Sequence, residues 1–283
     1  MLSELKVSLS SQQNTDFPFF TILTAALNSA STITRTLISI KNQGFQDLEH
    51  IVLDGGSKDG TLDILKNFEK AYNLHWTSKR DKGISSALNK GLKLAKGKYV
   101  LVLHADDCLL SPGILGYVFN LVKNQKLDIF SFPVLKERPD GGHLLYKPIR
   151  VLWWHHFKTI FPHQGSFVHQ RTFQALGGFR NNFSIAMDYD FFYRALKNNC
   201  SIKFEKKPVA LMGGAGISSN DFELVKRLRE EFQVHRLNEK NPLWRLAQIY
   251  FWMLYFPYKT VLFKKLRKTF IKRKTTSDLI ITE

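Results

Sequence analysis

Short apolar runs alternate with amphipathic segments through the first half of the chain. Four runs predict strands, because each is apolar or β-branched and bounded by turn residues. They are residues 19–26, 50–54, 74–77 and 99–104. The intervening helices are expected to end near residue 42 and to cover 61–72 and 84–95. This strand–helix alternation predicts an α/β fold with a mostly parallel, Rossmann-like sheet and helices on both faces.

The second half of the chain has a less regular pattern. Its expected elements are a helix over 111–123, strands over 128–134 and 164–169, a glycine turn at 139–143, a helix entered at Asp188, and a charged helix over 221–239. We divide the chain into a polar, flexible N-terminus at 1–16, a nucleotide-binding domain at 17–220 and a helical extension at 221–283. A glycine-rich loop at 212–220 precedes that extension.

Acidic side chains follow three of the predicted strands. Asp54 ends the second strand, Asp81 follows the third, and Asp106 and Asp107 follow the fourth. Ligands of open α/β sheets bind at the carboxyl ends of the strands, where such residues converge. Each acid alone is equally explained as a helix cap, but three at one edge favour a nucleotide and metal site.

The segment Met-Asp-Tyr-Asp at 187–190 opens a predicted helix with an apolar face. Asp188 is a candidate general base, and Asp190 a supporting residue of the first turn. The alternative is that Asp188 serves only as an N-cap. His163 and Lys82 are candidate phosphate or acceptor contacts, although a lone histidine is more often structural.

The net charge of the chain narrows the kinds of partner that it could bind. The formal net charge is +17, and eight basic residues with no acidic one lie between positions 259 and 274. Such a cluster favours an anionic partner. The N-terminus lacks the apolar core of a signal peptide, and the two cysteines form no framework, so a cytoplasmic location is expected.

Seven segments in one order resemble the family 2 inverting glycosyltransferases of the GT-A fold, and are most similar to bacterial enzymes of colanic-acid, exopolysaccharide and O-antigen synthesis. They are Thr-Ile-Leu-Thr at 21–24, Val-Leu-Asp-Gly-Gly-Ser-Lys-Asp-Gly-Thr at 52–61, Asp-Lys-Gly-Ile-Ser-Ser-Ala-Leu-Asn-Lys-Gly at 81–91, Leu-His-Ala-Asp-Asp at 103–107, His-Gln at 163–164, Leu-Gly-Gly-Phe at 176–179 and Met-Asp-Tyr-Asp at 187–190. The resemblance implies transfer of a sugar from a nucleoside-diphosphate sugar to a glycan or polyprenyl-linked acceptor in cell-surface polysaccharide synthesis.

The resemblance also implies roles for individual residues. Asp107 matches the ligand of a Mg²⁺ or Mn²⁺ ion on the donor diphosphate, and Asp106 matches a residue near the ribose or sugar. Asp188 matches the catalytic base. The residues matching the nucleotide-base pocket are Asp54 and Asp81, with Thr24 and Ala25 on its floor.

One position departs from the family pattern. Gly55 stands where many members carry a second acid that contacts uracil, and this departure leaves the base of the donor open, although a UDP-sugar is the first expectation. Two other functions are open to a basic α/β protein. A sugar nucleotidyltransferase would have a glycine-rich phosphate loop after the first strand, and Ala-Ala-Leu-Asn at 25–28 is unlike one. A nucleic-acid-binding protein would use the charge, but the basic run is terminal and no recognition motif accompanies it.

The aromatic segment at 242–258 precedes the basic run. Its apolar core is shorter than the ~20 residues of a spanning helix. Aromatic and basic residues together suit the interface of an anionic membrane, so the extension is expected to hold the enzyme peripherally on the inner face of the cell membrane. The alternative is a C-terminal helix packed on the domain, followed by a solvated tail.

Overall fold

The computed structural model describes residues 17–138, 140–158, 161–214 and 223–262. The predicted flexible N-terminus at 1–16 lies outside these residues, as do positions 215–220 of the predicted glycine loop and the basic run from 263 onward.

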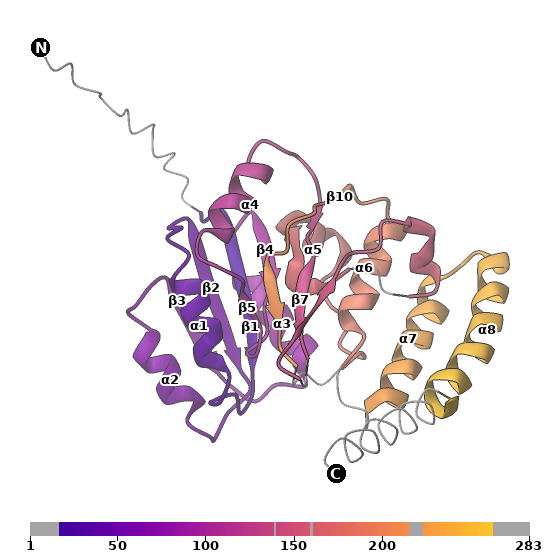
Figure 1. The fold of residues 1–283 in the computed structure, drawn as a ribbon, viewed down its shortest axis with the longest axis horizontal. Coiled ribbons are helices and arrows are strands. Elements are labelled where there is room, and N and C mark those ends of the chain that lie inside the picture. Colours follow the sequence, from indigo (N-terminus) through magenta and orange to yellow (C-terminus); the bar gives the residue numbers. More distant parts are fainter. Residues whose placement is uncertain (1–16, 139, 159–160, 215–222, 263–283) are drawn as a thin grey trace, which may run out of the picture.

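A seven-stranded sheet forms the centre of the molecule, in the order β10-β6-β9-β4-β1-β2-β3 (Figure 1). Its strands are β1 (Phe20–Ala26), β2 (Leu48–Asp54), β3 (Leu74–Ser78), β4 (Tyr99–Val102), β6 (Ile129–Ser131), β9 (Ser166–His169) and β10 (Ile202–Phe204). Every strand is parallel to the others except β9, which pairs antiparallel with both β4 and β6. The predicted α/β architecture with a mostly parallel sheet is therefore confirmed.

A second sheet of four strands lies beside the first, in the order β5-β11-β7-β8. Its strands are β5 (Cys108–Leu109), β11 (Ala210–Met212), β7 (Val134–Glu137) and β8 (His143–Tyr146). The glycine turn predicted at 139–143 joins β7 to β8, and Gly141 has a φ of +78°, which glycine adopts without strain. This sheet matters for the candidate site because β5 begins directly after Asp107 and β11 ends directly before Gly213.

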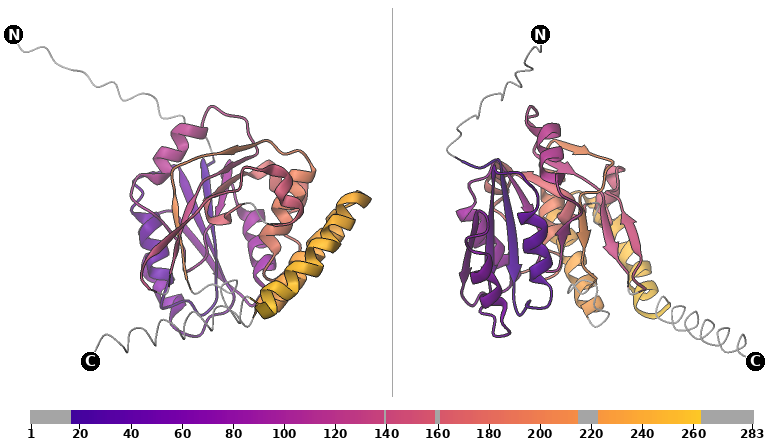
Figure 2. Two further views of the ribbon diagram at one scale, coloured as in Figure 1. Left: turned by 45° about the vertical axis from the view of Figure 1, so that its right-hand side comes forward. Right: turned by 60° about the vertical axis from the view of Figure 1, so that its left-hand side comes forward.

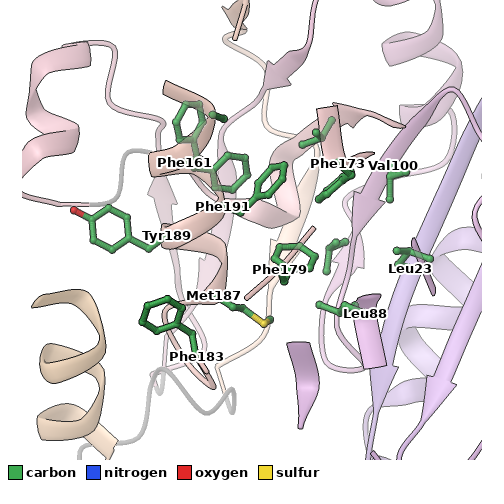
Figure 3. Packing of buried hydrophobic residues seen from close by; sticks show 14 of the residues in the cluster. Leu23, Leu88, Val100, Phe161, Phe173, Phe179, Phe183, Met187, Tyr189 and Phe191 are labelled. Carbon is green, nitrogen blue, oxygen red and sulfur yellow. The ribbon is translucent and has the colours of Figure 1, made fainter. Parts of the chain in front are cut away.

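Helices cover both faces of the main sheet. They are α1 (Ile33–Lys41), α2 (Thr61–Phe68), α3 (Ile84–Leu94), α4 (Ile114–Val122), α5 (Gln170–Leu176) and α6 (Met187–Lys197). Because successive side chains of a strand point to opposite faces, Phe20 packs in one cluster with α4 whereas Leu23 packs in another with α3 and α6. Figure 3 shows the second cluster, in which Leu23 and Leu88 lie on the sheet side and Phe191 and Met187 come from α6.

Two further helices, α7 (Leu224–Asn238) and α8 (Pro242–Pro257), lie at the end of the molecule away from α2 (Figures 1 and 2). The shorter elements are the 3₁₀ turns η1 (Leu152–His156) and η2 (His163–Gly165) and the π-helical turn η5 (Tyr258–Leu262). Hydrogen bonds link α7 to the segment before α6, so contacts cross the boundary predicted at 220. The division into domains stays a prediction.

Candidate active site

The turn after β2 is built around the carboxylate of Asp54. This side chain is buried and accepts hydrogen bonds from the backbone N–H groups of Gly56 and Ser57, at 2.9 Å each, and from the Ser78 hydroxyl at 2.6 Å. It also accepts the hydroxyl of Ser57. Burial acts to raise the pKa of Asp54, but these donors outweigh it and hold the pKa below its usual value. Asp54 therefore ties the end of β2 to the end of β3.

The other residues predicted for the base pocket lie near this turn. Asp81 follows β3 and pairs with Lys90 of α3, which leaves the Asp81 side chain 8% exposed. The backbone of Arg80 approaches Gly56, where an added Cβ would lie 3.7 Å from the Arg80 nitrogen. The structure thus brings the segments carrying Asp54 and Asp81 together, as the sequence predicts.

Thr24 and Ala25 lie at the carboxyl end of β1, beside β2. The Thr24 side chain is fully buried, and its hydroxyl lies 2.9 Å from Nε2 of His50. His50 in turn contacts the hydroxyl of Tyr72 at 2.7 Å. The side chain of Thr24 therefore points into the protein interior. Ala25 is partly buried and packs against the hydrophobic cluster that contains Leu23 and Leu88.

The acid turn, residues 103–107, follows β4. Asp107 is 1% exposed, and its carboxylate accepts the backbone N–H of His104 and that of Gly213, each at 3.0 Å. Its carbonyl oxygen accepts the Thr36 hydroxyl at 2.6 Å. Burial raises the pKa of Asp107 to about 6, and the neighbouring charge of Asp106 adds to this effect. Asp107 therefore joins the acid turn to the segment that follows β11.

Asp106 differs from its neighbour in being partly exposed. Burial raises its pKa. Its carbonyl oxygen accepts Nε of Arg35 at 3.1 Å, and the same guanidinium pairs with Glu137 of β7. A side chain at Gly213 would collide with the Asp106 carboxylate, so only glycine allows this close approach.

The candidate base, Asp188, lies in the first turn of α6. One carboxylate oxygen lies 3.0 Å from Nδ1 of His163, and the other accepts the backbone N–H of Tyr189 at 2.7 Å. The side chains remain accessible, with 26% of Asp188 and 19% of His163 exposed. His163 lies in η2, and its ring centre is 4.9 Å from that of His104 in the acid turn. The histidine pair therefore connects the base to the acid turn.

The charges of this pair support each other. Burial opposes the charge of His163, but the hydrogen bond and charge of Asp188, with the charges of Asp106 and Asp107, raise its pKa. Burial likewise acts against ionised Asp188, yet His163 outweighs it and holds the pKa of Asp188 below its usual value. Burial lowers the pKa of His104 to about 3, so this ring stays neutral. Each partner therefore favours the charged form of the other.

Helix α7 holds the segment that leads into α6. The Glu230 carboxylate accepts the N–H groups of Ser184, Ile185 and Ala186 at distances from 2.8 to 3.2 Å, and the Ser184 hydroxyl at 2.7 Å. Glu230 therefore caps the entry to α6, because it satisfies the N–H of the N-cap residue, Ala186, and those of the two residues before it. Asp190, fully buried, pairs with Arg180 and Arg194, so it supports the first turn rather than facing the site.

Sequence reasoning missed three of the residues that shape the site: Arg35, Gly213 and Glu230. Arg35 lies 71 residues from Asp106, and Gly213 lies 106 residues from Asp107, so no local motif connects them. The glycine-rich loop at 212–220 includes Gly213, but its sequence names no partner in the acid turn. In the described part of the chain, no group of three or more His, Cys, Asp or Glu side chains could hold a metal ion.

Comparison with known proteins gives consistent matches. The family model described as glycosyl transferase family 2 matches residues 21–183. A PGL/p-HBAD biosynthesis glycosyltransferase of Mycobacterium tuberculosis is 30% identical over 221 residues, covering 75% of this chain and 84% of the relative. The minor teichoic acid biosynthesis protein GgaB of Bacillus subtilis is 33% identical over 133 residues, covering 44% of this chain and 15% of that protein.

Solved structures share the fold at low sequence identity. The mannosyltransferase PcManGT from Pyrobaculum calidifontis, in complex with GDP-Man and Mn²⁺, has a TM-score of 0.63 and 17% identity, covering 83% of this chain and 69% of that one. Staphylococcus aureus TarS 1–349, in complex with UDP-GlcNAc, has a TM-score of 0.59 and 19% identity, covering 76% of this chain and 70% of that one.

Proposed function

This chain belongs to glycosyl transferase family 2, and from that premise we propose that it transfers a sugar from a nucleoside-diphosphate sugar to a glycan or lipid-linked acceptor with inversion. The family membership sets aside the two rival functions, sugar nucleotidyltransferase and nucleic-acid-binding protein. The observation that carries the proposal is the Asp188–His163 pair, which lies beside the acid turn at the carboxyl edge of the sheet. Sugar transfer needs a base for the acceptor and a site for the leaving diphosphate, and these two features supply them.

The base acts on the acceptor hydroxyl. Asp188 takes the proton as the hydroxyl oxygen attacks the anomeric carbon, on the face opposite the departing diphosphate, and this single displacement inverts the configuration. His163 keeps Asp188 ionised, and the Tyr189 N–H fixes the second oxygen. A carboxylate has about four lone-pair positions, so both contacts leave room for the acceptor hydroxyl.

A Mg²⁺ or Mn²⁺ ion fits the acid turn. Such ions are commonly held by one or two carboxylates together with substrate phosphates and water, which suits a site without a larger cluster of protein ligands. Exposure favours Asp106 as the ligand, because its side chain is partly exposed whereas that of Asp107 is 1% exposed. The sequence-based assignment of the ion to Asp107 stays a prediction that mutation can test. When bound, the ion would neutralise charge on the leaving diphosphate.

The Asp54 turn and Asp81 are assigned to the nucleotide base. Since the oxygens of Asp54 are engaged with Gly56, Ser57 and Ser78, we expect it to shape the pocket while the backbone around it contacts the base. A UDP-sugar is the first choice of donor. TarS was solved with UDP-GlcNAc and PcManGT with GDP-Man, so both bases are tested below.

The acceptor is assigned to cell-surface polysaccharide synthesis. Relatives named for PGL/p-HBAD biosynthesis and for minor teichoic acid biosynthesis support this assignment. An acceptor of this kind on a polyprenyl carrier would lie at the inner face of the cell membrane, where the basic run from 259 to 274 would meet anionic lipid.

Calorimetric titration of UDP, GDP and CDP tests the donor site. We expect one nucleotide to bind with Mn²⁺ present and to lose affinity when a chelator replaces the ion. Binding that is insensitive to the chelator would refute the metal assignment. Absence of binding by all three nucleotides, with and without Mn²⁺, would refute the donor site itself.

A further inference from the structure

The helix α8 presents a continuous apolar face to the outside. Five side chains on this face are between 57% and 75% exposed, and we call them the α8 outer face: Leu243, Leu246, Tyr250, Met253 and Leu254. Their spacing of three, four and seven residues puts them on one side of the helix. Gln248 and Trp252 lie on the opposite side and are buried. No charged residue occurs from position 246 to 258, so water meets an apolar strip along the helix.

A groove runs between this helix and the turn η1. Its volume is about 690 Å³, and every residue that lines it is aromatic or aliphatic. The lining includes Trp153, Trp154 and Phe157 from the η1 region and Tyr250, Leu254 and Tyr258 from α8 and its end. Trp153 is 52% exposed although its ring is large and apolar. A groove of this size and lining suits a hydrocarbon chain rather than a polar ligand.

Positive charge adjoins the outer face where the helix ends. The Lys259 ammonium lies 5.7 Å from the ring centre of Tyr255 and 5.8 Å from that of Tyr258. Lys259 is the first of the eight basic residues of the run that ends at 274, which contains no acidic residue. An anionic lipid surface complements this charge and also accepts apolar side chains. A second copy of the chain would bring the same positive charge against itself.

We propose that the α8 outer face and the η1 groove form a membrane-docking surface. In this arrangement α8 lies in the plane of an anionic bilayer interface, with its outer face among the lipids and one lipid hydrocarbon chain in the groove. The helix lies on the bilayer rather than crossing it, since no described helix is long and apolar enough to span one. Aromatic residues at the groove mouth suit the headgroup boundary.

The proposal rests on the proposed function for its purpose, because a lipid-linked acceptor has to reach Asp188. In Figure 1, α8 runs toward the side of the molecule to which β1 and β2 also run, and β4, which precedes the acid turn, is parallel to β1. Docking along α8 would therefore fix which side of the molecule faces the lipid surface. The basic run alone would attract the protein to anionic lipid without fixing this orientation.

Vesicle sedimentation of the full-length protein tests the outer face. We use vesicles of phosphatidylcholine with phosphatidylglycerol, at low salt and then at high salt, where the attraction of the basic run is screened. The double variant Leu246→Glu with Met253→Glu should lower the vesicle partition coefficient by about tenfold or more at high salt. Leu94→Glu is the matched control, since this exposed leucine lies on α3, and its partition should match that of the wild type.

Fluorescence tests the groove separately. Brominated acyl chains quench tryptophan in contact with them, so vesicles of brominated lipid should quench the wild type. The variant Trp153→Phe, which keeps an apolar ring in the groove, should lose a measurable share of this quenching. Unchanged quenching in this variant would overturn the assignment of the groove.

Three further results separate the alternatives. Equal sedimentation of the double variant and the wild type would overturn the docking face. A wild type that forms dimers without lipid, broken by the double variant, would assign the face to a second copy instead. Donor binding is measured in the same variants by calorimetry: its retention alongside lost sedimentation supports the docking surface, and its absence in the wild type would count against the proposed function alone.

Discussion

Removal of the Glu230 carboxylate should weaken the attachment of α6, the helix that carries Asp188. In Glu230→Ala, the N–H group of Ala186 loses its acceptor where water has little access, whereas the N–H of Ile185 is only partly buried. An unsatisfied buried donor costs about 1–3 kcal/mol, so the Ala186 group gives an expected loss of about 1–3 kcal/mol in the free energy of unfolding. The Ser184 donors are half-buried and can turn to water, so they add little.

The isosteric variant separates charge from hydrogen bonding. Glu230→Gln keeps an oxygen acceptor but loses the negative charge near the start of α6, and should cost about 1 kcal/mol. The pH dependence has a defined sign. Burial acts to raise the pKa of Glu230, but the donors around Ser184 outweigh it and depress the pKa below the usual 4.5. The stabilisation is therefore present above the unfolded pKa and is lost as pH falls through the folded value.

Urea unfolding followed by circular dichroism measures these differences. Glu223→Gln is the control on the same helix, because its contact with Lys226 is long, at 3.8 Å, and exposed, so its loss should cost less than about 0.5 kcal/mol. A Glu230→Ala protein within about 0.5 kcal/mol of the wild type would refute the capping role.

Three other predictions concern the site and its histidines. Asp188→Asn should keep donor binding and lower kcat by about a hundredfold or more in a sugar-transfer assay, and unchanged turnover would sink the base assignment. Asp106→Asn should abolish the Mn²⁺-dependent part of nucleotide binding in calorimetry. Asp107→Asn should chiefly lower the free energy of unfolding, by about 1–3 kcal/mol, and the reverse pattern would return the ion to Asp107. Burial lowers the pKa of four histidines to about 3 or 4, far below the usual 6.5. As pH drops below about 6.5 the unfolded state therefore gains protons first, and the free energy of unfolding should fall. A pH series of urea unfolding should reveal this slope, and a flat profile from pH 7 to 5 would contradict it. The histidines are His50, His104, His156 and His235.

The strands and helices of the main sheet follow from local sequence. Residues 50–54 are an apolar run ending in an acid, and they form most of β2. Residues 99–104 were expected as a strand, and β4 covers Tyr99–Val102 before the chain turns at His104. The periodicity of hydrophobic residues predicts such strands because the burial of each strand depends on the residues within it. The four-stranded sheet escaped prediction, since β5 and β11 have only two and three residues.

The choice between two adjacent acids depends on the fold. Asp106 and Asp107 are chemically alike, and sequence alone does not say which one faces the site. In the fold, the N–H of Gly213 binds Asp107 from a position 106 residues away, while the missing side chain of Gly213 leaves space for Asp106, and these contacts support the proposal that Asp106 faces the donor. Such long-range contacts carry no periodicity that a single sequence displays.

The same reasoning applies to His163. As a lone histidine beside a predicted strand, it was a candidate substrate contact, although such a residue is more often structural. Its partner Asp188 lies 25 residues later, on a different element. Only the meeting of η2 with the start of α6 turns two separate motifs into a paired base.

Hydrogen bonds continue from this base to the helix proposed for docking. The Trp252 indole N–H donates to Nδ1 of His235 at 2.8 Å, so the ring of neutral His235 carries its proton on Nε2, which contacts the Tyr189 hydroxyl. Tyr189 then donates its own proton to the carbonyl of His155 at 3.0 Å. Every donor in this series meets an acceptor only when His235 is neutral. Burial lowers the pKa of His235 to about 3, which keeps its ring neutral. Because Tyr189 directly follows Asp188, a displacement of α8 would strain contacts one residue from the base. The outer face of α8 and the chemistry at α6 are therefore parts of one connected structure.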